Sequence, residues 1–380
     1  MRIGITCHPT IGGSGTVATD VGIRLARRGH QVHFISYDLP FRLIMEYDEN
    51  IFFHAVNVTN YPLFKFPPYD LALASRMAEV AERQKLDIFH VHYAIPHAAC
   101  AILAKLIAQD TRIKVVTTLH GTDITYVGND PSFFRITKFS IESSDAVTAV
   151  SEWLRRRTQE EFQTQCNIRT IYNFIDTNKF RPRPCVRSRF SRDDEKIVMH
   201  MSNFRPVKRV RDVVEVFHLI KKQVPSRLVL IGEGPELSVA DQMIKGFGIT
   251  DHVEYLGTQD CVEDIIPCAD LLLLPSEYES FGLAALEAMA SEVPVVASRS
   301  GGLIELIDHG KTGFLADVGD VQTMAAHGIE VLTNPEVARK IGTQARQSAI
   351  ERFNPDIIVD QYEELYRSVV EMDNVGRTRR

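Results

Sequence analysis

Apolar strand patterns alternate with helical patterns along this chain, and this alternation restricts the fold more than any other feature. Residues 2–7 form an apolar run, residues 16–28 have helical periodicity, and residues 31–36 form a second apolar run. A strand, a helix and a strand within about 35 residues are typical of a βαβ unit, so a parallel sheet is expected. The alternation restarts at residues 196–201 and continues through residues 313–315. We therefore predict an α/β protein with two parallel sheets.

A stretch rich in proline and arginine separates the two series of strands and helices. Arg181-Pro182-Arg183-Pro184 suits neither a helix interior nor a central strand, because proline lacks the backbone N–H. A chain of 380 residues is also too long for one ordinary hydrophobic core. We therefore predict an N-terminal Rossmann-like domain over residues 1–176 and a C-terminal Rossmann-like domain over residues 177–355.

Charge, hydropathy and cysteine pattern argue against several classes of protein. The net charge is −6 and the chain has no long block of Lys or Arg, which argues against a nucleic-acid partner. No run approaches about 18 apolar residues, so we expect no integral membrane contact and a cytoplasmic protein. Six cysteines are scattered without a C-x-x-C pair, which suits a reducing compartment and no structural zinc.

The segment from Glu279 to Glu287 carries the strongest indication of a binding site. It follows an apolar run at residues 271–274, and residues 283–289 are strong helix formers. Gly282 therefore lies at a helix start, where free backbone N–H groups and the helix dipole favour a phosphate. The two carboxylates would repel a phosphate, so we expect them to accept hydrogen bonds from hydroxyls. This combination describes a sugar nucleotide, although two solvated acids on a surface helix would have the same spacing.

A glycine-rich segment near the N-terminus indicates a different class of protein. Gly13-Ser14-Gly15-Thr16-Val17-Ala18 matches the dinucleotide-binding fingerprint, and Asp38 lies 20 residues beyond Ala18. The alternative function is therefore an NAD-dependent oxidoreductase. Against it, residues 8–12 separate the strand pattern from a fingerprint that normally follows its strand at once.

Histidines gather at the ends of two strand patterns in the first domain. His90 and His92 share one face of a strand, but no third ligand stands at a standard spacing, so no metal site is predicted. His120 ends the next strand, at the carboxyl edge of the predicted sheet, where ligands bind in open α/β folds.

The segment Glu279-Ser280-Phe281-Gly282 with Glu287 resembles the motif of retaining glycosyltransferases of family four, which have the GT-B fold. The resemblance implies two Rossmann-like domains that face a cleft, with residues 356–380 returning to the first domain. It also implies that Glu287 holds the donor ribose and that Glu279 touches the donor sugar. Phe281, Gly282 and Leu283 would meet the phosphates.

A second motif, residues 202–209, is expected to supply positive charge for those phosphates. Lys208 resembles the family lysine that grips the diphosphate. The family often has an arginine where this sequence has Asn203, so Arg205 or Arg209 is expected to assist.

The resemblance also implies the course of the reaction. The expected catalytic residues are Lys208, Glu279 and His120, with His120 near the reacting carbon of the donor sugar. Gly13 and Leu256 are expected as further donor contacts. The transfer would be retaining and independent of metal and cofactor, and the departing phosphate would take the acceptor proton.

Several segments of the first domain resemble a branch of this family that transfers GlcNAc from UDP-GlcNAc to the hydroxyl of L-malate in bacillithiol synthesis. These segments are residues 4–7, 11–19, 66–71, 92–97 and 117–125. A dicarboxylate requires hydroxyl donors and cations, and the acceptor-site candidates are Ser14, Tyr93, Thr122, Lys65 and Lys138. The alternatives are another anionic acceptor such as an inositol phosphate, or a sugar-nucleotide-binding protein without turnover. The sequence does not decide between a monomer and a homo-oligomer.

Overall fold

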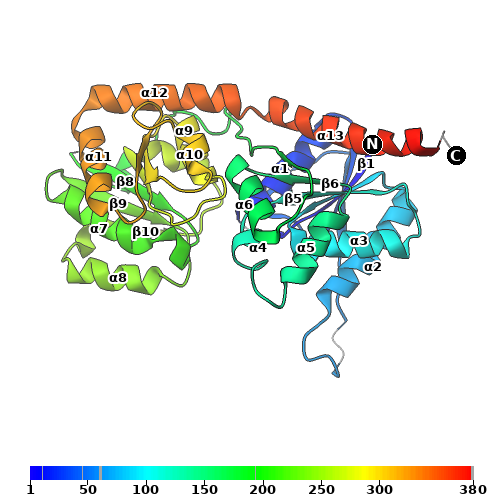
Figure 1. Cartoon of the computed structure of the whole chain (residues 1–380). Coiled ribbons are helices and arrows are strands. Elements are labelled where there is room, and N and C mark those ends of the chain that lie inside the picture. Colours follow the sequence, from blue (N-terminus) through cyan, green and yellow to red (C-terminus); the bar gives the residue numbers. More distant parts are fainter. Residues whose placement is uncertain (11, 45, 60–61, 193, 378–380) are drawn as a thin grey trace. The chain divides into compact units, whose positions relative to one another are not determined.

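The chain forms two compact α/β units, drawn in Figure 1. The computed structural model describes residues 1–10, 12–44, 46–59, 62–192 and 194–377. The first unit comprises Met1–Asn173 and Pro355–Arg380, and the second comprises Phe174–Asn354. Among the described residues, no helix has both the length and the apolar character that a membrane span requires.

The first unit contains a parallel sheet of seven strands in the order β3-β2-β1-β4-β5-β6-β7. The strands are β1 (Arg2–Thr6), β2 (Gln31–Ser36), β3 (Ile51–Ala55), β4 (Ile88–His92), β5 (Lys114–Leu119), β6 (Ala146–Ala149) and β7 (Ile168–Thr170). The helices are α1 (Gly13–Arg27), α2 (Tyr69–Gln84), α3 (Ala99–Ile107), α4 (Thr122–Thr125), α5 (Phe134–Ser143), α6 (Glu152–Phe162) and α13 (Pro355–Arg377).

The second unit contains a parallel sheet of six strands in the order β10-β9-β8-β11-β12-β13. The strands are β8 (Lys196–Met201), β9 (Ser226–Ile231), β10 (Val253–Gly257), β11 (Leu271–Leu274), β12 (Val295–Ser298) and β13 (Phe314–Ala316). The helices are α7 (Val210–Lys221), α8 (Leu237–Gly246), α9 (Leu283–Ala290), α10 (Leu303–Leu306), α11 (Val321–Thr333) and α12 (Pro335–Arg352).

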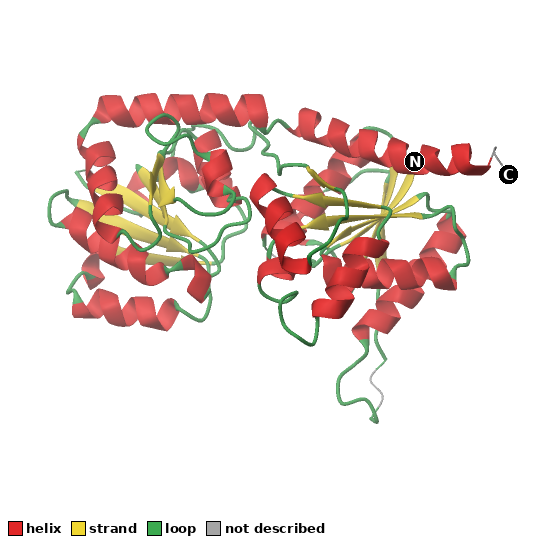
Figure 2. Ribbon diagram, in the orientation of Figure 1, coloured by secondary structure: helices red, strands yellow, loops and turns green. Residues whose placement is uncertain are grey.

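Helices cover both faces of each sheet, as Figure 2 shows, so the central strands are buried on both sides. Strands in this position are continuous apolar runs rather than alternating ones. Accordingly, all four leucines of β11 are buried, and so are all six residues of β5. The predicted α/β class with two parallel sheets is confirmed.

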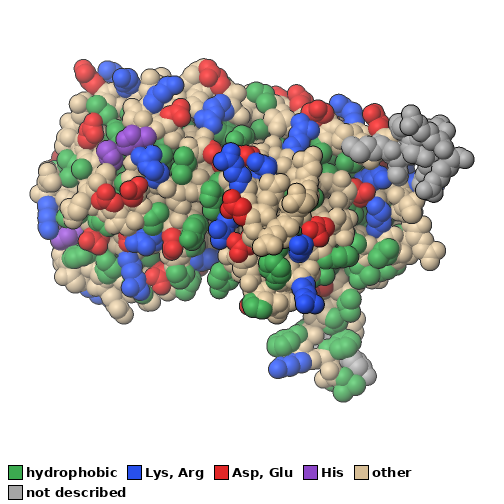
Figure 3. Space-filling view, in the orientation of Figure 1, with side chains coloured by type: hydrophobic (Ala, Val, Ile, Leu, Met, Phe, Trp, Pro, Cys, Tyr) green, Lys and Arg blue, Asp and Glu red, His purple; other side chains and the backbone are tan. Residues whose placement is uncertain are grey.

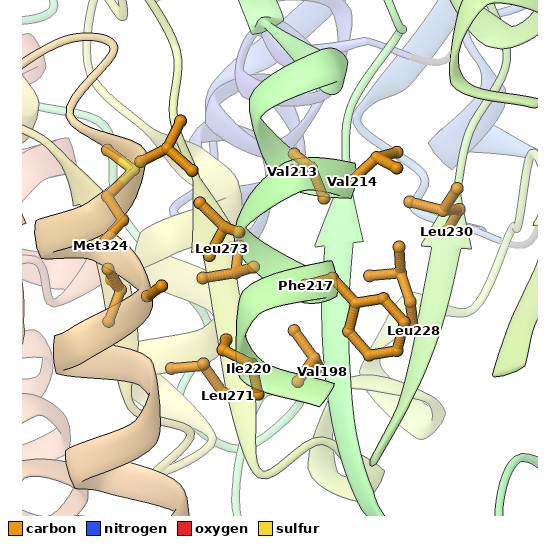
Figure 4. Close-up of a cluster of buried hydrophobic side chains, with 14 of the residues drawn as sticks. Val198, Val213, Val214, Phe217, Ile220, Leu228, Leu230, Leu271, Leu273 and Met324 are labelled. Atoms are coloured by element: carbon orange, nitrogen blue, oxygen red, sulfur yellow. The ribbon is translucent and has the colours of Figure 1, made fainter. Parts of the chain in front are cut away.

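The hydrophobic core of the second unit lies between its sheet and the helices α7 and α11. The helix α7 buries Val213, Val214, Phe217 and Ile220, which share one side of the helix at intervals of three and four residues. These side chains pack against strand residues such as Leu271, as the close-up in Figure 4 shows. This core holds β8 and β11 in register, and the candidate site begins at the carboxyl ends of both strands.

The last helix, α13, packs on the first unit and completes its core. Tyr366 is fully buried, and its hydroxyl lies 2.7 Å from His90 Nδ1, in the middle of β4. At the surface, Arg28 donates to Asp360 at 2.5 Å, and His30 Nε2 lies 2.7 Å from Glu363. The implied return of the final helix to the first domain is therefore present.

One pair of cysteines departs from the pattern expected of unpaired thiols. Cys185 and Cys268 form a disulfide, with Cα atoms 5.6 Å apart and a sequence separation of 83. Arg187 holds the same two segments together by donating to the Cys268 carbonyl at 2.7 Å and to Asp270 at 2.7 Å. Such a separation carries no local signature, so the spacing of the cysteines could not indicate the pair. Cys7, Cys100, Cys166 and Cys261 are free.

We predict that Tyr366→Phe destabilises the first unit by about 1–3 kcal/mol, because His90 Nδ1 would be left buried without a partner. The single tryptophan, Trp153, lies in α6 of this unit, so urea unfolding followed by its fluorescence measures the effect. Tyr47→Phe is the matched control, since Tyr47 is 96% exposed. Equal stability of the two variants would contradict the prediction.

Candidate active site

The strand order of each sheet identifies where a ligand can bind. In a doubly wound sheet, ligands bind at the carboxyl ends of the strands where the strand order reverses. That reversal falls between β1 and β4 in the first unit and between β8 and β11 in the second. The candidate residues from the sequence lie mainly on the loops that follow these strands.

In the second unit, the loops after β8 and β11 are joined by direct contacts. Lys208 Nζ donates to Glu279 Oε2 at 2.5 Å, and both side chains are mostly buried. The backbone N–H of Glu277 donates to the Val207 carbonyl at 2.8 Å, which ties the two loops at the residues before this pair. The structure thus brings together two predicted catalytic residues that are 71 positions apart.

Gly282 immediately precedes helix α9, as the sequence predicted. Its φ of +102° lies in the left-handed region, where a side chain would be strained. A Cβ at this position would also lie 2.7 Å from Leu303 Cδ2. Glycine therefore allows the chain to turn into the helix and leaves its first N–H groups available to an anion. Glu287, one turn further along α9, is only 8% exposed.

A pair of glycines, Gly301 and Gly302, supports the loop that carries Glu279, and its role was not predicted from the sequence. The N–H of Gly302 donates to the Glu279 carbonyl at 2.7 Å. A Cβ on Gly301, which has a φ of +57°, would lie 2.0 Å from that same carbonyl oxygen. The signal that could have revealed this contact is the position of Gly301-Gly302 just after β12, the strand that pairs with β11.

A buried histidine anchors the loop that carries Lys208. His200 Nδ1 lies 2.8 Å from the Leu273 carbonyl, which can only accept, so Nδ1 carries the proton. His200 Nε2 therefore accepts from the Ser202 hydroxyl at 2.8 Å, and Ser202 Oγ accepts from the Phe204 N–H at 3.2 Å. Burial lowers the pKa of His200 to about 4, so this network is neutral. It links β11 to the first residues of the loop after β8.

The other donor-side candidates are less closely joined. Asn203 and Arg205 are exposed, and Arg209 donates through Nε to Asp212 Oδ2 at 2.7 Å. Leu256 lies in β10, whose neighbour β9 separates it from β8. Phe281 is buried against Phe353, with ring centroids 5.5 Å apart, so its side chain serves packing while its backbone borders Gly282.

In the first unit, His120 lies at the end of β5 in contact with a group of neutral histidines. Its Nε2 is 2.8 Å from His92 Nδ1, and the Tyr93 ring stacks on it at 5.6 Å. Burial lowers the pKa of His120 to about 3 and that of His97 to about 3. Within the described part of the chain, no group of His, Cys, Asp or Glu side chains could hold a metal ion.

Asp123 fixes the backbone on which His120 and Tyr93 stand. Its carboxylate is fully buried and accepts from the N–H groups of His120 at 3.1 Å, Gly121 at 2.9 Å and Ala94 at 3.0 Å. The ends of β4 and β5 are therefore held by one side chain. Gly121 is the N-cap of α4, and no side chain caps this helix.

The predicted acceptor-site residues divide into two groups. Ser14, Tyr93 and Thr122 are half-buried and lie on loops or first helical turns that follow β1, β4 and β5. Gly13 begins α1 beside Ser14. Lys65 is exposed on the loop before α2, and Lys138 lies in α5, 3.8 Å from Glu142. Lys65 Nζ lies 5.5 Å from the centre of the Phe66 ring, so the contacts given for both lysines are with residues of their own segments. On the face shown in Figure 3, Lys and Arg are interspersed with Asp and Glu.

A lysine beside a helix start suits a diphosphate, and nearby carboxylates suit hydroxyls, which is the combination that a sugar nucleotide presents. Two Rossmann-like units of this kind define the class of GT-B glycosyltransferases. A family model described as glycosyltransferase family 4 matches residues 11–179, and one described as glycosyl transferases group 1 matches residues 186–348. The chain belongs to glycosyltransferase family 4 and is a glycosyltransferase.

Individual relatives agree with this assignment. The chain is 50% identical over 380 residues to the N-acetyl-alpha-D-glucosaminyl L-malate synthase of Bacillus anthracis, with 99% of each chain covered. Its fold is similar to that of sucrose-phosphate synthase from Thermosynechococcus elongatus, with a TM-score of 0.81, 21% identity and 98% and 99% of the chains covered. It is also similar to Anabaena Alr3699/HepE in complex with UDP-glucose, with a TM-score of 0.80, 23% identity and 97% and 100% covered.

The alternative of an NAD-dependent oxidoreductase is wrong. The glycines that matched the fingerprint lie inside the first turn of α1, and β1 ends at Thr6, well before them. Asp38 is exposed on the loop after β2, where it accepts from the Leu39 N–H at 2.8 Å. The match therefore reflects a glycine-rich loop and helix start common to many phosphate-binding folds.

We predict that Asp123→Asn removes a pH dependence of stability. Burial raises the pKa of Asp123 from 3.8 to about 6, so the folded protein binds this proton more tightly than the unfolded chain does. The resulting stabilisation is complete below pH 3.8 and is lost as the pH rises to about 6. The stability of the wild type relative to the variant should therefore decline across this window, as measured by urea unfolding and Trp153 fluorescence.

Asp130→Asn is the matched control for this measurement. Asp130 is exposed, and hydrogen bonds from Ser132 lower its pKa, so the contribution of Asp130 is lost as the pH falls. The two variants should thus show opposite trends. A wild-type advantage over Asp123→Asn that grows with pH would contradict the prediction.

Proposed function

We propose that this protein transfers GlcNAc from UDP-GlcNAc to the hydroxyl of L-malate, with retention of configuration, to form GlcNAc-α-malate for bacillithiol synthesis. The observation that carries this proposal is the 50% identity, over 99% of both chains, to an N-acetyl-alpha-D-glucosaminyl L-malate synthase. The residues described above support the proposal by their chemistry.

The second unit is the proposed donor-binding domain. The N-terminus of α9 at Gly282 and the ammonium of Lys208 would bind the diphosphate of UDP-GlcNAc. Lys208 has three N–H donors, and Glu279 uses one of them, so the remaining donors can reach phosphate oxygens. Through this bond Glu279 orients Lys208, and Glu279 also accepts hydrogen bonds from hydroxyls of the donor sugar. Glu287 accepts hydrogen bonds from the ribose hydroxyls. Arg209 is the more restrained of the two assisting arginines, since Asp212 holds it.

The first unit is the proposed acceptor-binding domain. Ser14 in the first turn of α1 and Thr122 in the first turn of α4 place hydroxyl donors at the carboxyl edge of the sheet. Tyr93 adds a third donor beside the His120 ring. Hydroxyl and backbone donors of this kind would bind the carboxylates of L-malate. Lys65 and Lys138 would contribute long-range attraction, because Lys65 lies over the Phe66 ring and Lys138 lies 3.8 Å from Glu142.

The proposed reaction proceeds by positioning and by electrostatic stabilisation of the departing UDP. Lys208 and the start of α9 stabilise the negative charge that develops on the diphosphate, which is the role a metal ion has in other transferases. His120, which stays neutral, contacts the donor sugar without bringing a charge to it. The departing phosphate takes the proton from the malate hydroxyl, so no separate protein base is required.

We predict that Glu287→Ala weakens UDP binding by about 1.5–3 kcal/mol, roughly 10- to 150-fold in Kd, because the ribose hydroxyls lose a charged acceptor. Titration calorimetry with UDP measures this change. Glu351→Ala, which removes an exposed carboxylate of the same unit, is the control and should bind UDP like the wild type. Unchanged affinity in Glu287→Ala would exclude the ribose contact.

We predict that the enzyme releases UDP from UDP-GlcNAc with L-malate and is far slower with L-lactate at equal concentration. L-lactate retains the hydroxyl but lacks one carboxylate, so the donors built for that carboxylate would be left unpaired. UDP release coupled to a spectrophotometric assay measures both rates. Equal use of the two acids would contradict a dicarboxylate site. Turnover with an inositol phosphate instead of malate would assign the acceptor to that class.

A further inference from the structure

The contact between His120 and His92 restricts where His120 carries its proton. His120 Nε2 and His92 Nδ1 are 2.8 Å apart in a buried environment. Burial lowers the pKa of both side chains, so both imidazoles are neutral and each carries one proton. Only one of the two facing nitrogens can then hold a hydrogen. Either His92 donates and His120 carries its proton on Nδ1, or His120 donates and carries it on Nε2.

The far nitrogen of His92 decides between the two arrangements. His92 Nε2 is buried and has no hydrogen-bond partner among the described residues. The neighbouring ring, His90, has both nitrogens engaged, by Tyr366 and by Thr118 Oγ1 at 2.7 Å each. If His120 donated, His92 would bear an N–H on Nε2 that nothing accepts, and orphaned buried N–H groups are rarer than unsatisfied acceptors. If His92 donates from Nδ1, its Nε2 carries only a lone pair without a partner. This arrangement is therefore the favoured one.

We propose that His92 is a positioning residue that holds neutral His120 in the Nδ1–H tautomer, so that His120 donates a hydrogen bond to an oxygen of the bound donor sugar. This role rests on the proposed function. The His120 side chain is restrained on two sides, since His92 holds Nε2 and the Tyr93 ring stacks on its face with an angle of 24° between the planes. Nδ1 has no partner among the described residues and is the nitrogen left for a ligand.

The arrangement of His92 itself is restrained by its own neighbours. His97 Nδ1 donates to the His92 carbonyl at 2.5 Å, and Asp123 accepts from Ala94 two residues later. The backbone that carries His92 is therefore held on both sides of Tyr93. This rigidity gives the His92 ring one orientation in which Nδ1 faces His120.

Nitrogen-15 NMR of histidine-labelled protein tests the tautomer without any substrate. The His120 signals are identified by their absence in His120→Gln. We expect His120 in the unliganded wild type to be protonated on Nδ1 and bare on Nε2. A proton on Nε2 would overturn the proposal, whatever reaction the enzyme catalyses. If the tautomer is as expected but UDP-GlcNAc and L-malate do not react, the proposed function fails and the assignment of His92 stands.

Paired substitutions test the consequence for turnover. His92→Leu removes the donor and should reduce kcat on the order of 100-fold, with a mixed tautomer at His120. His92→Asn keeps an amide N–H near the position of Nδ1 and should restore most of the lost kcat. His33→Leu is the matched control, because His33 is also buried and also bonded to a histidine, with Nδ1 3.0 Å from His54 Nε2 on β3. It should turn over like the wild type.

The comparison among these variants is decisive in either direction. Equal losses in His92→Leu and His33→Leu would mean that any buried histidine of this sheet matters equally, and this would contradict the proposal. So would a His92→Asn variant as slow as His92→Leu, since packing rather than hydrogen bonding would then be responsible. If His92→Leu does not fold, the NMR measurement on the wild type decides alone.

Discussion

The hydrogen-bonded pairing of strands that are not consecutive in sequence is the constraint on which the candidate residues of each unit depend. β1 pairs with β4 in the first unit, and β8 pairs with β11 in the second. Each pairing forces the chain to leave the sheet in two directions from adjacent strands, which opens a space above their carboxyl ends. The side chains that reach this space lie on loops, and the sheet fixes the residue at which each loop begins. The cores beneath therefore act on the chemistry indirectly, by fixing the spacing of the strands.

Much of this architecture could be predicted from the sequence, because apolar runs and helical periodicity are local signals. The bounds of β2, β8 and the start of α9 coincide with the predicted ranges. Contacts between distant segments were less accessible. The sequence suggested Lys208 and Glu279 separately, but their direct bond follows from strand pairing that no single segment encodes. The roles of Asp123 and Gly301 stayed hidden for the same reason, since both act on backbone groups of other loops.

The two units place different kinds of polar group at equivalent positions. In the second unit, a charged pair stands at the reversal of strand order, and it stays partly accessible. In the first unit, the corresponding region contains neutral histidines and one carboxylate that satisfies backbone N–H groups. Burying neutral rings costs less free energy than burying charges, so the first unit can hold its polar groups rigidly and away from water. This difference agrees with the proposal that the second unit binds the charged nucleotide.

The position of α13 has a consequence for how the chain is made. Tyr366 and His90 are 276 residues apart, and the whole second unit is encoded between them. During synthesis, β4 therefore emerges long before the helix that covers its histidine. The second unit has all of its strands and helices while α13 is still to come. The domain whose synthesis begins first is thus completed last. Until α13 has been synthesised, His90 Nδ1 is exposed to water instead of being bonded to the Tyr366 hydroxyl.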